Sequence, residues 1–177
     1  MRTMNALRFE RYGSPSVLSV RNVGIPDLER GEVLIEVHAS AINPSDVKNI
    51  SGGFSASLPR TPGRDYAGVV VGGDARKGEE VWGSGAGFGI TRDGSYAQYI
   101  IVQSDWLSSK PANLSMEQAA ATGVPYLAAW SEGEPRVGAE DHPGDRAVHR
   151  RVVRAGGGVA ALERSYVAAR LALVRPP

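Results

Sequence analysis

Two short turns hold the polar residues of this 177-residue sequence that are best suited to chemistry. The first turn is Asn43-Pro44-Ser45-Asp46, and its Asn43 amide could donate a hydrogen bond to a substrate carbonyl oxygen. Asn43 could equally cap a short helix, and the two roles are compatible. Ser45 suits the first turn of that helix, and Asp46 suits either the same turn or a structural contact with the loop backbone. Asn43 is therefore the strongest candidate for a group that faces a substrate or cofactor.

The second turn, Arg64-Asp65, allows two interpretations. In one, Arg64 or Asp65 lines a substrate cleft. In the other, Asp65 caps the turn and Arg64 is exposed. We expect Gly63 and Gly68 to be needed there for backbone conformation and close packing.

The elements that position these turns are predicted to be short strands. Residues 33–38 alternate apolar and polar side chains, with Val33, Ile35 and Val37 on one face. Short strands between Gly- and Pro-rich turns favour a mainly β fold, either a small barrel or a sandwich. Further strands are expected at residues 4–10, 17–23, 66–71, 79–82 and 94–102.

Helices are expected in two places. A short one should span residues 43–52, with Pro44 at its first position. A second should begin at Ser115, where Ser115 and Gln118 have the spacing of a capping box. We expect Gly123 and Pro125 to interrupt it, so that a further helix starts at Tyr126.

Composition excludes several classes of protein. The net charge of +1 gives no reason to expect nucleic acid as a partner, and no apolar run is long enough to span a membrane. The first ten residues lack the apolar core of a signal peptide, so a cytoplasmic location is expected. The absence of Cys excludes disulfides and thiolate metal sites, and the three His residues do not cluster at a metal-binding spacing.

Two glycine-rich segments could be taken for phosphate-binding loops. Residues 83–94 are expected between strands, so a flexible loop over the barrel is the better interpretation. Residues 156–161 fit the pattern G-x-G-x-x-A, but Arg-rich sequence precedes them and too few residues follow for an acidic partner of the ribose. We interpret that match as chance.

Three spaced motifs carry a family resemblance. They are V-L-I-E-V at residues 33–37, A-I-N-P-S-D-V-K at 41–48 and P-G-R-D-Y-A-G-V-V at 62–70. Together they resemble the medium-chain dehydrogenases/reductases, in particular the zinc-independent, quinone oxidoreductase-like branch, over about Met4 to Trp130. The resemblance implies a GroES-like, partly open barrel over residues 1–114, followed by interdomain helices over residues 115–130.

The same resemblance bears on the metal. In the zinc-dependent branch, a Cys at the position of Asn43 and a His at the position of Arg64 ligate zinc, and a Glu stands at the position of Asp65. Arg is not a metal ligand because it stays protonated. The resemblance therefore implies an enzyme without a metal ion.

By the same resemblance, the implied reaction is NADPH-dependent reduction of a quinone or enone, with Asn43 and Asp46 as catalytic residues. Related enzymes often carry Tyr in the cleft near the position of Phe54, and a Thr that touches the nicotinamide at the position of Ala128. Tyr126 could also face the cofactor. Full-length relatives imply a possible homodimer and a small carbonyl, quinone or enone substrate.

The composition changes after Trp130. Residues 131–177 contain eight Arg but no Lys, Ile, Phe, Asn or Thr, although all five of these occur earlier. We hypothesise that the reading frame is lost there, which leaves an aberrant tail and no complete dinucleotide-binding domain, so that the chain alone is inactive. The alternatives are a genuine diverged C-terminus, a non-enzymatic GroES-like assembly module, and a non-functional product.

Overall fold

The computed structural model of the chain describes residues 2–73 and 76–133, and the structural statements below concern these residues. Side chains within this range are described up to Leu127. The predicted tail over residues 131–177 thus lies outside the described part, apart from the three positions that end the last helix.

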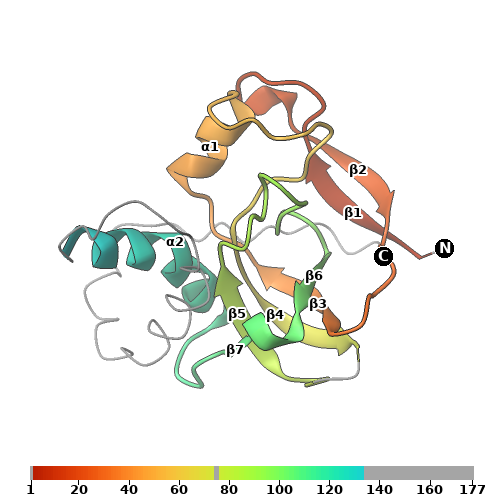
Figure 1. Cartoon of the computed structure of the whole chain (residues 1–177), viewed down its shortest axis with the longest axis vertical. Helices are drawn as coiled ribbons and strands as arrows, with labels where there is room; N and C mark the ends of the chain where they lie inside the picture. The colour runs from red at the N-terminus through yellow and green to blue at the C-terminus, as the bar shows by residue number, and fades with distance from the viewer. Residues whose placement is uncertain (1, 74–75, 134–177) are drawn as a thin grey trace.

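The described chain is mainly β and forms two antiparallel sheets (Figure 1). Strands β1 and β2 make the predicted hairpin, with a short 3₁₀ turn between them. The larger sheet has the strand order β6-β3-β4-β5-β7, and its two edge strands do not pair with each other. The sheet is therefore not closed, which confirms the predicted partly open architecture. The strands are β1 (Thr3–Arg8), β2 (Ser19–Gly24), β3 (Glu32–Ala39), β4 (Asp65–Gly72), β5 (Glu80–Ser84), β6 (Tyr99–Gln103) and β7 (Ser108–Ser109).

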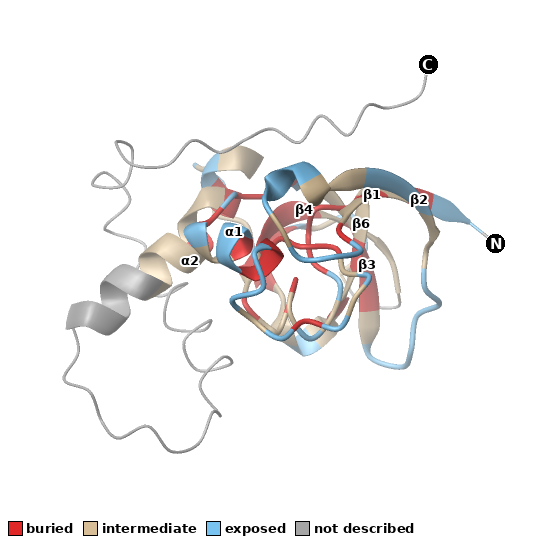
Figure 2. Cartoon of the chain, turned by 90° about the horizontal axis from the view of Figure 1, so that it is seen from above, coloured by how far each residue is buried: buried red, intermediate tan, exposed pale blue. Residues whose placement is uncertain are grey.

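The main hydrophobic core is formed largely by side chains of the larger sheet. Most of them are β-branched or aromatic, which suits a pleated surface. Val33 and Ile35 of β3 are fully buried in it, as their predicted face requires. Leu34, on the other face, is also buried, so β3 is covered on both sides. Figure 2 shows this burial along β3 and β4. The main cluster consists of Val33, Ile35, Tyr66, Val70, Val81, Phe88, Ile100 and Val102.

Two helices flank the sheet. Helix α1 (Pro44–Ile50) follows Asn43, its N-cap residue, and begins with Pro44 as predicted. Helix α2 (Met116–Gly133) starts after the predicted capping box, in which the Ser115 N–H donates to Gln118 Oε1 at 2.9 Å. Ala119 and Ala120 pack this helix onto the sheet. Neither helix is both long and apolar enough to cross a membrane.

The predicted break in α2 is wrong, because the helix continues through Gly123 and Pro125. Pro removes one backbone donor from a helix interior. Tertiary contacts hold this part of the helix against the sheet, since Gly123 packs directly against Asp65 and Ser84 and the Val124 N–H donates to Asp65.

Strand β6 is shorter than predicted, beginning at Tyr99 rather than near Gly94. Before it, Ala97 makes only an isolated bridge to Ala6 of β1. The loop of residues 83–94 does not lie loosely over the barrel, because Phe88 is buried in the core and packs edge-on against Tyr66. The structure confirms that this loop joins two strands and precedes no helix N-terminus.

Gly68 marks the closest approach of two strands. A Cβ atom at this position would collide with the backbone carbonyl oxygen of Glu36. Gly63, in contrast, has a φ of +101°, in the region that favours Gly. Both expectations about these glycines are confirmed, for two different physical reasons.

Gly68→Ala should lower the free energy of unfolding by about 3 kcal/mol, because the clash is with backbone and cannot be relieved by a rotamer change. The matched control is Gly78→Ala, at an exposed turn with a φ of +85° and no atom within 4 Å of the added Cβ. That variant should lower the free energy of unfolding by about 1 kcal/mol. Denaturant unfolding of the three proteins measures both values, and equal costs would contradict the close packing of β3 and β4.

Candidate active site

Asp65 lies at the centre of a buried polar cluster, although it stands at the first position of β4. Its Oδ2 accepts a hydrogen bond from Asn43 Nδ2 at 2.8 Å, and its Oδ1 accepts the Val124 N–H at 3.1 Å. Its backbone carbonyl accepts the hydroxyls of Ser40 and Ser95, each at 2.7 Å. One residue therefore joins the approach to α1, helix α2, the end of β3 and the loop before β6.

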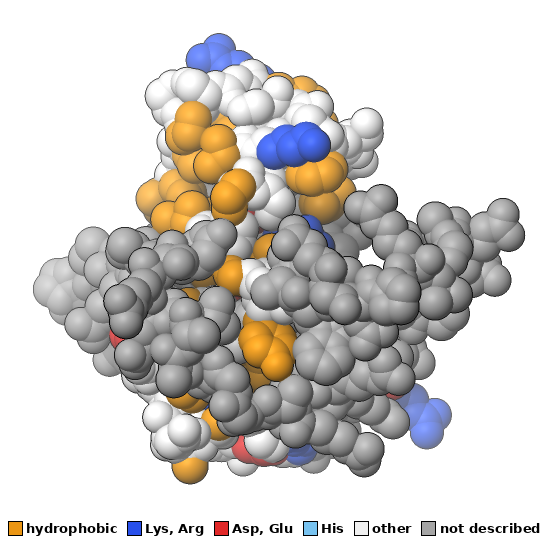
Figure 3. Space-filling model, turned by 90° about the vertical axis from the view of Figure 1, so that its left-hand side faces the viewer, with side chains coloured by type: hydrophobic (Ala, Val, Ile, Leu, Met, Phe, Trp, Pro, Cys, Tyr) orange, Lys and Arg blue, Asp and Glu red, His pale blue; other side chains and the backbone are white. Residues whose placement is uncertain are grey.

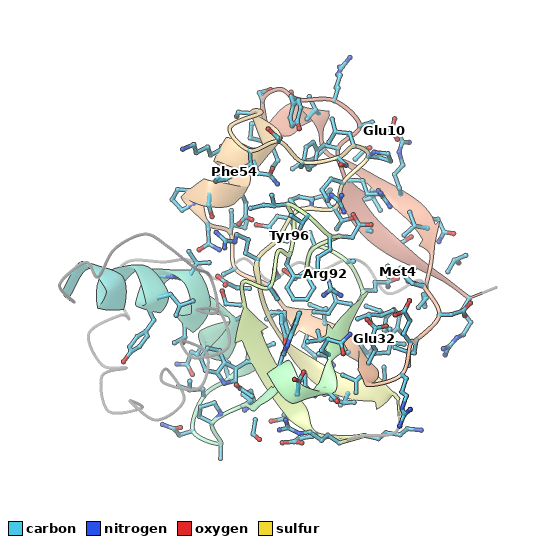
Figure 4. The ribbon with its side chains drawn as sticks, viewed as in Figure 1. Met4, Glu10, Glu32, Phe54, Arg92 and Tyr96 are labelled. Carbon is cyan, nitrogen blue, oxygen red and sulfur yellow. The ribbon has the colours of Figure 1, made fainter. Side chains whose placement is uncertain are left out.

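Asn43 and Asp46 form the first turn of α1. The Asp46 carboxylate accepts the Asn43 N–H at 2.8 Å, which is the contact that the third helical residue makes back to the N-cap in a capping box. Asp46 Oδ2 also lies 3.1 Å from the Tyr96 hydroxyl, which is equally close to the Ala41 carbonyl oxygen. Figure 4 shows Tyr96 in the middle of the molecule. We call Asn43, Asp46, Asp65 and Tyr96 the Asn43 cluster.

The Asn43 cluster contains two buried carboxyl groups. Burial raises the pKa of Asp65 to about 6, against the opposing effect of the Ser84 hydroxyl, the Asn43 amide and the Val124 N–H. Burial also raises the pKa of Asp46, and the nearby Arg64 charge acts in the opposite direction. The pKa of Tyr96 is raised by burial and by Asp46, so this hydroxyl stays protonated. At neutral pH the cluster holds negative charge that accepts hydrogen bonds.

Three of the predicted site residues thus come together, namely Asn43, Asp46 and Asp65. Ser45 lies in the first turn of α1, and its buried Oγ has no hydrogen-bond partner among the described residues. Arg64 is half-buried next to Asp65, and its Nε has no partner in the same part of the chain. The structure therefore contradicts the interpretation in which Arg64 is exposed in the turn.

The other predicted site residues lie apart from the cluster or outside the description. Phe54 lies beside α1 (Figure 4), with Lys48 Nζ 5.5 Å from its ring centroid. Tyr126 is half-buried on α2, two residues beyond Val124. The side chain of Ala128 is outside the described part.

Sequence reasoning missed four members of this site. Ser40, Ser95 and Tyr96 come from the end of β3 and the loop before β6, and Val124 contributes only its backbone. Ser95 and Tyr96 do follow Asp93-Gly94 in a turn, which is a signal for a polar loop. Nothing in their spacing connects them to Asn43, because the connection is made by folding.

The residues at the positions of the zinc ligands do not fit a zinc site. The Asn43 amide nitrogen offers no lone pair because that pair is delocalised into the carbonyl group, and Arg64 is a permanent cation. No group of three or more His, Cys, Asp or Glu residues suited to a metal occurs in the described ranges. The donor chemistry here is that of hydrogen bonds to a carboxylate.

Residues 29–112 match the family model of the alcohol dehydrogenase GroES-like domain. The chain belongs to the medium-chain dehydrogenase/reductase superfamily. This membership confirms the resemblance carried by the three motifs and the predicted GroES-like fold.

Three similar proteins illustrate the relationship. A zinc-type alcohol dehydrogenase-like protein of Schizosaccharomyces pombe is 40% identical over 141 residues, which cover 75% of this chain and 43% of the relative. An NADPH-dependent alkenal/one oxidoreductase of Arabidopsis thaliana is 36% identical over 171 residues, which cover 90% of this chain and 43% of the relative. The structure of a quinone oxidoreductase from Coxiella burnetii superposes with a TM-score of 0.67 at 28% identity. The match covers 73% of this chain and 44% of the Coxiella chain.

The chain spans less than half the length of each of these relatives. The Arabidopsis alignment covers 90% of the chain, so it continues beyond α2 and past the compositional change near Trp130. The frame-loss hypothesis stays a prediction, and the coding DNA beyond Trp130 decides it.

Asp65→Asn should remove a pH dependence of stability. The pKa of Asp65 rises on folding from 3.8 to about 6, so the stability linked to this group is greatest below pH 4 and is lost as the pH rises through 6. Between pH 4 and pH 7 the free energy of unfolding of the wild type should therefore fall by about 2 kcal/mol relative to Asp65→Asn. Denaturant titrations at both pH values measure it, and parallel pH profiles would contradict the assignment.

Proposed function

We propose that this chain supplies the acceptor-binding part of a metal-free reductase that transfers a hydride from NADPH to a quinone or an activated alkene. The observation that carries the proposal is the buried Asn43 amide, held by Asp65 at 2.8 Å in the position where zinc-dependent relatives have a ligand. The names of the Coxiella and Arabidopsis relatives support the two substrate classes.

The chemistry of such a reduction calls for a hydrogen-bond donor. Bound NADPH supplies the hydride, and negative charge then develops on the carbonyl oxygen of the acceptor. Asn43 Nδ2 has two hydrogens, one of which goes to Asp65, which leaves the second for that oxygen once an acceptor reaches this buried amide. A donor that is already in place stabilises the developing charge without reorganisation.

The surroundings of Asn43 suit an apolar acceptor. Ile42 and Val47, on either side of Asn43 in sequence, are 46% and 41% exposed. Figure 3 shows hydrophobic side chains gathered on the upper part of the face that carries α1. A quinone or enone presents a flat apolar body with a carbonyl oxygen, which matches an amide donor beside apolar side chains. The unpartnered Ser45 hydroxyl is a further group that could bind the polar end of the cofactor or the acceptor.

Asn43→Ala should reduce turnover of a simple quinone or enone by about 100-fold, because the oxyanion loses its donor. NADPH oxidation followed by absorbance measures the rate. The matched control is Asn22→Ala, at an exposed position of β2 whose amide bonds only to Asn5, at 3.4 Å. That variant should keep the wild-type rate.

Two results would count against this proposal. Equal turnover of wild type and Asn43→Ala would remove Asn43 from the reaction. Absence of any NADPH-dependent reduction, together with a stable defined oligomer in light scattering, would favour the assembly-module alternative.

The chain alone should bind NADPH weakly. The glycine-rich loop of residues 83–94 joins strands and leads into no helix, so it offers no helix N-terminus for a diphosphate. We expect a fluorescence titration to give a dissociation constant above 100 µM, roughly, as for a site that holds only the nicotinamide end. Micromolar binding would show that the remaining residues complete a dinucleotide site.

A further inference from the structure

We propose that Asp65 is a positioning residue, whose buried carboxylate sets the orientation of the Asn43 amide and ties that amide to helix α2. The chemical consequence of this orientation rests on the proposed function. The orientation itself does not, and it can be tested without turnover.

The two oxygens of the Asp65 carboxylate accept hydrogen bonds from different partners. Oδ2 accepts from Asn43 Nδ2 at 2.8 Å, and Oδ1 accepts from the Val124 N–H at 3.1 Å. An ionised carboxylate can only accept hydrogen bonds. The Asn43 amide must therefore turn its NH₂ group, and not its oxygen, toward Asp65, and this decides where its second N–H lies.

Asp65 is itself held in place on two sides. Its backbone carbonyl accepts the hydroxyls of Ser40 and Ser95, which lie 2.6 Å from each other. On the side of α2, Gly123 approaches so closely that an added Cβ would collide with Asp65 Oδ1. The carboxylate consequently has little freedom to rotate, and the position of α2 is transmitted to Asn43.

Several charged and polar groups surround the pair of Asn43 and Asp65. Asp46 on α1 raises the pKa of Asp65, and Arg64 precedes it in the chain. The Tyr96 hydroxyl faces Asp46 from the loop before β6. From α2 the group in contact with the carboxylate is the Val124 N–H. The Asn43 side-chain amide donates to the Asp65 carboxylate at 2.8 Å, and its interaction with the Asp46 carboxylate lowers the pKa of Asp46 against the larger effect of burial.

Asp65→Asn should break this arrangement while it preserves the shape of the side chain. An Asn has one acceptor oxygen and one donor NH₂ group, so it cannot accept from both Asn43 and Val124 through separate oxygens. The backbone N–H of Val124 cannot turn round. Either the Asn43 amide reverses or its link to α2 is lost, and in both cases the Asn43 amide changes its environment.

The experiment uses the full chain labelled with ¹⁵N at Asn, which occurs only five times, and follows the side-chain amide resonances from pH 5 to pH 8. Asn43 is assigned from the resonance that disappears in Asn43→Gln. In the wild type, the Asn43 resonances should show the largest pH-dependent shift of the five. In Asp65→Asn that titration should be absent, and the Asn43 resonances should be displaced at every pH.

The matched control is Asp46→Asn, which neutralises the other buried carboxylate but leaves the hydrogen bond between Asn43 Nδ2 and Asp65 Oδ2 in place. It should retain the titration of the Asn43 side chain. The wild-type titration needs no variant, so it tests the proposal even if a variant does not fold. The proposal is overturned if the wild-type Asn43 side-chain resonances do not move, or if Asp46→Asn abolishes the titration while Asp65→Asn preserves it.

Turnover separates this proposal from the proposed function. If the wild type reduces a quinone, Asp65→Asn should lower kcat by about 10-fold and change KM for the acceptor little, since the donor is misplaced but still present. An inactive wild type that also fails to bind the quinone acceptor, but shows the expected Asn43 titration, would refute the proposed function and support the positioning role. An active wild type without that titration would support the proposed function and refute the positioning role.

Discussion

The buried carboxylate of Asp65 is the interaction on which the rest of this site depends. Removing a carboxylate from water is costly unless donors replace the lost hydration. Here an amide and a backbone N–H surround the two oxygens, and two serine hydroxyls hold the adjacent carbonyl. Each donor comes from a different element, so the need to satisfy one charge specifies how α1, α2 and the strands meet.

The sheet makes this arrangement possible because it is rigid at the point where Asp65 begins β4. Strands β3 and β4 approach so closely at Gly68 that no side chain fits between them. The main core packs directly beyond, around Val33, Ile35 and Tyr66. A polar group at the end of such a strand moves little, and this suits a site that must hold a donor in place.

The same scaffold positions carry different chemistry in zinc-dependent relatives of the superfamily. At this place the chain has an amide that donates to a buried carboxylate. Arg64, beside it, adds a positive charge but no lone pair. In the function proposed above, the Asn43 amide is the group that acts on the acceptor carbonyl, and its pairing with Asp65 holds it in place.

Much of the local structure could be predicted because its causes are local. The alternation of residues 33–38, the Pro at the start of α1 and the Ser115–Gln118 capping box each act within a few residues, and each appears as expected. The three motifs also indicated the superfamily, which the family model and the similar proteins confirm.

The tertiary structure decided what depends on contacts between distant segments. Helix α2 continues through Gly123 and Pro125, and Asp65, 59 residues before Val124, accepts the Val124 N–H within it. Ser40, Ser95 and Tyr96 join the site from segments whose sequences show no relation to Asn43. The residue types that can do chemistry were thus readable in the sequence, whereas the buried environment that orients them exists only once β3, β4, α1 and α2 have packed together.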